Sequence, residues 1–143
     1  MSNLWSRSIG VLIGQVSDDL SGMWSLLATG RCAALSLASD PELDRQLTFT
    51  FAALELSEAL ADLEWAHPEL TTISATVDLY EVPDGAAADA HRALVDLLTS
   101  TVGTAARILR QQDDVLATGD ILCLARVTHR VSAAHALLVP EPS

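Results

Sequence analysis

Apolar residues recur every three or four positions along most of this chain, which is the spacing of one face of an α-helix. The first stripe runs from about residue 3 to residue 37 and includes Trp5, Ile9, Leu12, Val16, Leu20, Met23 and Leu27. This pattern predicts one long helix over the segment. A glycine inside a helix weakens it, so Gly30 is expected to interrupt or end this one.

A second helix is predicted from Pro41 to Ala66. Asp40 can cap its start, proline suits the first helical position, and Pro68 ends the helix because the residue before a proline avoids the helical region. The apolar residues of this helix form two stripes, one of Leu47, Phe51 and Leu54 and another of Phe49, Ala53, Leu56, Leu60 and Leu63. An apolar arc this broad predicts a helix that is central or that also meets another subunit.

The stretch from residue 70 to residue 82 fits two patterns. Leu70, Ile73, Val77 and Tyr80 have helical spacing, whereas the apolar residues from Ile73 to Leu79 also alternate with polar ones, as in a strand. Residues 46–53 alternate in a similar way. Because a lone strand without partners is unstable, a helix is the favoured interpretation.

Two more helices are predicted, over residues 86–117 and 121–139, with turns at residues 83–85 and at Gly119 and Asp120. Long helical segments with short joints predict an all-α fold, an up-and-down four-helix-type bundle in a single domain over residues 1–143. One helix is segmented, with the second helix and its continuation acting as one rod. The alternative is an α+β fold with short strands near 46–53 and 71–82.

The charge balance is strongly acidic, with 19 acidic residues against 8 basic ones and a net charge of −11. This argues against binding to nucleic acid or to an anionic membrane surface, both of which need basic patches. No apolar run reaches the roughly 20 residues that span a bilayer, and no signal peptide is evident, so a cytoplasmic protein is expected. Every basic residue is arginine, and the chain is rich in alanine, which points to a GC-rich bacterial genome.

The residues suited to metal chemistry do not form a complete pattern. Glu64 and His67 make one E-x-x-H pair, but a di-metal bundle needs a second such pair. His67, next to a proline at a helix end, is expected to project into solvent. Cys32 and Cys123 lie far apart and are expected to be small buried thiols of a reducing compartment. We therefore expect no metal and no cofactor.

Several arginines near the last joint allow two interpretations. Arg107, Arg110, Arg126 and Arg130 could together bind an anion, because guanidinium groups match carboxylates and phosphates. The favoured interpretation is that they pair with surrounding acids of the chain, such as Asp113, Asp114 and Asp120.

The sequence contains no pattern of catalytic residues that we recognise, so an enzyme is the less favoured class. The leading hypothesis is a non-catalytic helical bundle that acts by self-association or protein–protein interaction, as an accessory or regulatory bacterial protein, and that forms a homodimer. Gly10 and Gly14 have the spacing that lets another helix approach closely, including at a subunit contact.

The alternative hypothesis is a bundle that binds a small molecule, either a ligand sensor or a minor biosynthetic enzyme. Its pocket would lie between helices. The candidate ligand-binding residues are Tyr80, Arg126, His129 and His135.

Overall fold

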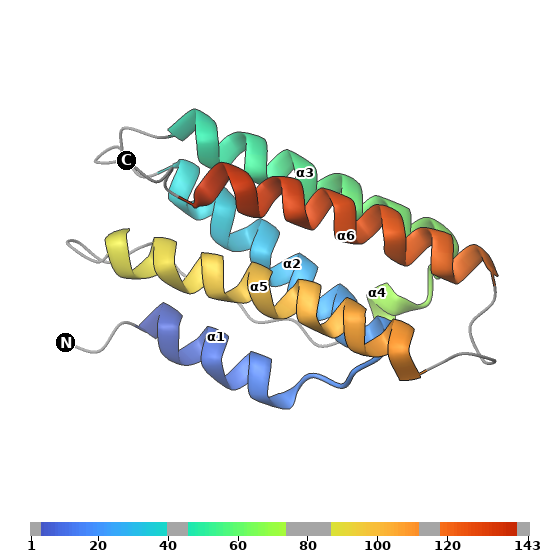
Figure 1. The fold of residues 1–143 in the computed structure, drawn as a ribbon. Helices are drawn as coiled ribbons and strands as arrows, with labels where there is room; N and C mark the ends of the chain where they lie inside the picture. Colours follow the sequence, from blue (N-terminus) through green and yellow to red (C-terminus); the bar gives the residue numbers. More distant parts are fainter. Residues whose placement is uncertain (1–3, 40–45, 74–86, 112–117, 140–143) are drawn as a thin grey trace.

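The structure is a computed structural model that describes residues 4–39, 46–73, 87–111 and 118–139 (Figure 1). These residues form the helices α1 (Leu4–Gln15), α2 (Leu20–Ala38), α3 (Gln46–Ala66), α4 (Leu70–Ile73), α5 (Ala87–Gln111) and α6 (Thr118–Leu138). They contain no strand, so the all-α class is confirmed. The strand alternative at 46–53 is wrong, because these residues begin α3. Residues 74–86, which include the predicted turn at 83–85, lie outside the described ranges.

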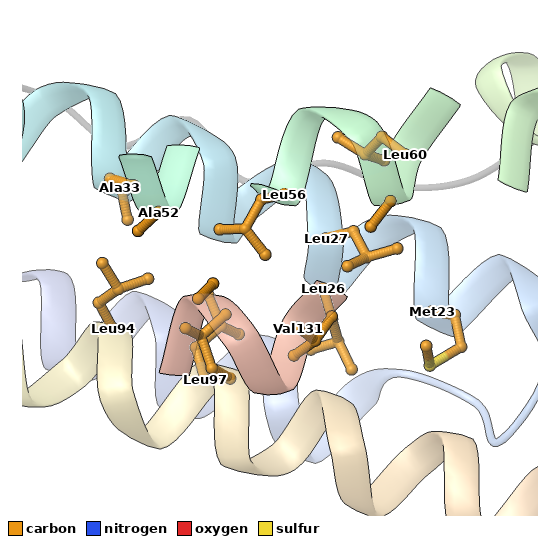
Figure 2. Close-up of a cluster of buried hydrophobic side chains, with 14 of the residues drawn as sticks. Met23, Leu26, Leu27, Ala33, Ala52, Leu56, Leu60, Leu94, Leu97 and Val131 are labelled. Carbon is orange, nitrogen blue, oxygen red and sulfur yellow. The ribbon is translucent and has the colours of Figure 1, made fainter. Parts of the chain in front are cut away.

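The four long helices α2, α3, α6 and α5 pack in a ring. In it, α2 contacts α3 and α5, and α6 contacts the same two helices from the other side. Neighbours in the ring run antiparallel (Figure 1). Leucines from α2, α3 and α5 meet Val131 of α6 in the core that the ring encloses (Figure 2). The helix α1 lies outside the ring and packs against α5.

The prediction of one helix over residues 3–37 is wrong, because the chain reverses direction between α1 and α2 (Figure 1). Asp19 starts the new helix: its backbone is extended, and its carboxylate accepts a 2.8 Å hydrogen bond from the backbone N–H of Gly22. The apolar spacing survives the reversal because α1 and α2 both turn this stripe inward. Trp5 and Ile9 of α1 are buried, as is Met23 of α2.

Gly30, expected to interrupt the first helix, lies inside α2. A Cβ atom on this glycine would lie 3.4 Å from Leu56, 3.5 Å from Leu98 and 3.6 Å from Leu97. These are ordinary van der Waals distances. Gly30 therefore lies where α2 packs against both α3 and α5, and the helix continues through it.

The second helix and its continuation do not form one rod. The helix α3 ends at Ala66, and α4 packs against α2 instead of extending α3. Its first residue, Leu70, is buried. The helices α3 and α5, which follow one another among the long helices of the ring, run in the same direction, so these helices do not alternate in a simple up-and-down order (Figure 1). The expected joint at Gly119 and Asp120 is also shifted, because α6 already begins at Thr118.

At one end of the bundle, a histidine side chain of α5 contacts both α6 and α3. His91, in the first part of α5, donates a 2.8 Å hydrogen bond from Nε2 to the backbone carbonyl of Leu138, the last residue of α6. The ring of Phe49 from α3 meets the same imidazole edge to face, at 5.2 Å and 82°. A helix leaves its last carbonyls without helical partners, so His91 satisfies one of them while joining three helices.

We expect Gly22 to be the glycine that the reversal requires. A Cβ there would lie 2.0 Å from the backbone oxygen of Ser17, so Gly22→Ala should lower the free energy of unfolding by about 2 kcal/mol. The control is Gly10→Ala in α1, where no described atom lies within 4 Å of the added Cβ. It should raise stability by about 0.5–1 kcal/mol through helix propensity. Urea unfolding measures both, and equal effects at the two sites would contradict this assignment.

A second prediction concerns the buried hydroxyl of Thr29 in α2, whose oxygen has no hydrogen-bond partner among the described residues. Because an unsatisfied buried polar group costs free energy, Thr29→Val should stabilise the fold by about 1 kcal/mol. Thr101 is the matched control: it is equally buried, but its hydroxyl donates a 2.8 Å hydrogen bond to the carbonyl of Leu97. In the same unfolding assay, Thr101→Val should raise the free energy of unfolding by less than Thr29→Val does. A loss of stability in Thr29→Val would overturn the prediction.

Candidate interaction surface on α3

The helix α3 is apolar on two opposite faces. One face packs in the core and consists of Phe49, Ala52, Ala53, Leu56, Ala59, Leu60 and Leu63. The opposite face carries five exposed apolar residues, which we call the α3 stripe: Leu47, Phe51, Leu54, Ala61 and Trp65. The two predicted stripes of this helix thus both exist, and only one of them is buried within the chain.

The exposure of the α3 stripe is large for apolar side chains. Trp65 is 90% exposed, Leu47 71%, Leu54 56% and Phe51 52%. With aromatic side chains taken as about 200 Å² each, the stripe presents apolar surface on the order of 500 Å². Patches of this size are at the upper end of what single soluble chains expose, and they are often functional.

The spacing within the α3 stripe follows a seven-residue repeat. Its members and Glu58, which fills the one polar position, stand at 47, 51, 54, 58, 61 and 65. Steps alternating between four and three are those by which one helix meets another along a shared seam. The stripe therefore has the pattern of a helix-pairing surface.

An ion cluster joins α3 to α6 along one edge of the stripe. Arg130 of α6 donates from Nη1 to Oε2 of Glu58 and, at 3.4 Å, from Nε to Oδ2 of Asp62. The Oε2 atom of Glu55 lies 3.6 Å from the same Nη1. The three carboxylates stand on successive turns of α3, and one guanidinium neutralises part of their charge.

The arginines do not converge on a shared anion site within the described residues. Arg130 faces the acids of α3, whereas Arg107 of α5 donates a 2.9 Å hydrogen bond from Nε to Asp18, next to the start of α2. Pairing with acids of the chain was the favoured prediction, and it holds for these two. The acids differ from those expected, since Asp113 and Asp114 lie outside the described ranges and Asp120 binds a histidine.

The members of the E-x-x-H pair bind different partners. Glu64 accepts a 2.9 Å hydrogen bond from Nε1 of Trp24, which satisfies a nearly buried indole of α2. His67 lies 2.6 Å from Asp120 through Nε2 and 3.2 Å from Glu69 through Nδ1. The expectation that His67 projects into solvent is wrong, because it connects the end of α3 to the first turn of α6. No group of three potential metal ligands was found among the described residues.

The pKa of His67 is raised, chiefly by its hydrogen bond to Asp120 and also by Glu69, while partial burial opposes the shift. A raised pKa means that the folded chain binds this proton more tightly than the unfolded chain does. The stabilisation is therefore complete below pH 6.5 and is lost as the pH rises through the raised pKa of His67.

The two cysteines are free thiols. Cys123 is buried, and burial together with the nearby Asp62 raises the pKa of its thiol. A raised pKa keeps the thiol protonated and therefore a poor nucleophile. Cys32 is half-buried, so only Cys123 is fully buried as expected.

The predicted ligand-binding residues are spread around α6. Arg126 and His129 are exposed, whereas His135 is half-buried against α5, with Nε2 3.2 Å from Oγ1 of Thr99. Tyr80 lies outside the described residues. Ligand binding by this set stays a prediction.

A described pocket of about 80 Å³ lies elsewhere, between α1 and α5. It is lined by Ser6, Ile9, Gly10, Ile13, Ala93 and Asp96. Pockets for small molecules usually enclose several hundred Å³, so this one is small. Gly10 and Gly14 are exposed, and no described atom lies within 4 Å of a Cβ at either position, so their spacing does not serve a close helix contact within the described chain.

Comparison with known protein families, curated proteins and solved structures gives no match for this chain. Among the described helices, none has the length and apolar character needed to cross a membrane.

We expect Asp120→Asn to reduce the pH dependence of stability that His67 contributes. The wild-type protein should lose stability on the order of 1 kcal/mol between pH 5.5 and pH 8.5 through His67, and the variant should lose less, because only the contact with Glu69 remains. Asp89→Asn is the matched control, since Asp89 is the acidic residue in the first turn of α5, as Asp120 is in α6. Urea unfolding at both pH values tests this, and a pH dependence that is identical in Asp120→Asn and the wild type would contradict the role of the pair.

Proposed function

We propose that this protein acts by self-association through the α3 stripe, as a non-catalytic accessory or regulatory protein, and that the associated form is a homodimer. The observation that carries the proposal is the exposure of Leu47, Phe51, Leu54 and Trp65 on the face of α3 opposite the core. Contact with water makes such a surface unfavourable, and burying it against another apolar face gains free energy.

The polar contacts around the stripe support a binding role. Arg130 joins α6 to α3, Trp24 joins α2 to Glu64, and His67 joins the end of α3 to Asp120. Each of these groups connects two elements of the fold. They hold α3 in place on both sides, so the stripe is presented on a helix whose position is set by the bundle.

A second copy of the chain is the simplest partner for this surface. Two such stripes in contact would remove on the order of 1,000 Å² from water, which lies at the low end of specific interfaces. We therefore propose a reversible dimer with a dissociation constant on the order of micromolar. The free thiols Cys32 and Cys123 support a reducing compartment, such as the cytoplasm, as its location.

The test is sedimentation of the purified protein over a range of concentrations. The wild-type chain should shift from monomer to dimer, and Leu54→Glu should weaken association at least tenfold because it places a carboxylate in the apolar contact. The matched control is Leu35→Glu, since Leu35 of α2 is 50% exposed and Leu54 56% exposed. This control should dimerise like the wild type.

Two results would count against the proposal. A monomer mass at every concentration up to about 1 mM would exclude self-association as the function. Equal weakening of dimer association by Leu54→Glu and Leu35→Glu would show that the α3 stripe is not the surface through which the copies associate. Neither leucine is in the core, so both variants should keep their helices. Far-ultraviolet circular dichroism of each variant checks this.

A further inference from the structure

The α3 stripe is symmetric about Leu56. Counting outward from this residue, Leu54 corresponds to Glu58, Phe51 to Ala61 and Leu47 to Trp65. A second stripe laid antiparallel on the first can therefore match it along its whole length. We propose, building on the self-association above, that two copies pair along α3 in antiparallel orientation, around a two-fold axis that crosses the exposed face of α3 at the level of Leu56.

The side-chain sizes support this orientation. The antiparallel arrangement sets Phe51 of one copy opposite Ala61 of the other, so that the larger side chain meets the smaller one. It also pairs Trp65 with Leu47, the two most exposed large apolar side chains among the described residues. A parallel, in-register arrangement would set Ala61 against Ala61 and leave a gap there, which well-packed interfaces avoid.

The charge at the centre of the stripe favours the same orientation. In a parallel pair the two Glu58 residues would stand at the same level of the seam and repel each other. In the antiparallel pair each Glu58 lies opposite Leu54 of the other copy, and the two glutamates are offset by about 6 Å along the helix axis. Each remains bound to Arg130 of its own chain, which offsets its charge at the edge of the contact.

The length of the α3 stripe fits pairing with a second copy. A 21-residue helix is about 31 Å long, and the stripe covers about 27 Å of it. Antiparallel pairing about the centre lets the two stripes overlap completely. The helix α6, which packs against α3, carries two further exposed leucines, Leu122 at 56% and Leu137 at 37%.

The orientation is testable with spin labels on one flank of α3. Thr50 and Ser57 stand seven positions apart, so they occupy the same flank, beside the stripe rather than in it. Around an axis at Leu56, labels at residue 57 are offset by about 3 Å along the helix, and labels at residue 50 by about 18 Å. Thr50→Cys and Ser57→Cys would be made in a Cys32→Ala chain, leaving the buried Cys123 in place.

Pulsed electron paramagnetic resonance of the two labelled dimers gives the result. We expect the distance between labels at residue 50 to exceed that at residue 57 by about 8 Å or more. Equal distances would show a parallel pair and overturn this inference while leaving self-association through α3 intact. If no distance between labels on two copies is detected and sedimentation shows a monomer, the proposed function itself would be overturned. Sedimentation of the labelled chains checks that the labels do not disturb the dimer.

Discussion

The apolar packing of α2 against both α3 and α5 is the contact around which this ring of helices is arranged. At Gly30, leucines of α3 and α5 lie within 3.6 Å of the place where a Cβ atom would stand, which is ordinary van der Waals contact on both sides of α2. The helix α6 then closes the ring from the other side. Because each helix of such a ring turns one face inward, each also has a face turned outward. The helix α1 packs against α5 from outside the ring, whereas the outward face of α3 carries the exposed stripe.

The helical class could be predicted from the sequence because apolar spacing reports which side chains face a core. The reversal between α1 and α2 could not be read from that spacing. Residues 16–19 make up about one helical turn, so the apolar stripe continues across them in nearly the same phase. The local signals were present in Asp19 and Gly22, but their meaning depends on the approach of Ser17, which is a property of the folded chain.

The exposed stripe was visible in the sequence for the same reason, since Leu47, Phe51 and Leu54 recur at helical spacing opposite a second stripe. The contacts around the stripe could not be predicted from the sequence, because they join residues far apart in the chain. His67 and Asp120 are 53 positions apart, and Arg130 is 68 positions from Asp62. Such pairs depend on the order and register of helices, which spacing within one helix does not contain.

The candidate ligand residues of α6 do not share one face of the helix. Arg126, His129 and His135 were named as candidates for a pocket between helices, but residues nine positions apart on a helix point toward different neighbours. His135 meets Thr99 of α5, while the other two face outward. Nearness in sequence is a weaker guide to a shared site than a repeated phase on one face.

Leu54 and Leu56 stand two positions apart on α3, one exposed and the other buried. A substitution of Leu56 by a smaller residue opens a void in the core and destabilises every molecule. A change at Leu54 leaves the interior of the molecule untouched, and under the proposed pairing its effect would appear only when copies associate. Under the proposed pairing, natural selection would act on these neighbouring leucines by separate routes: changes at the outer position would alter how copies meet, and changes at the inner one would alter how each copy folds.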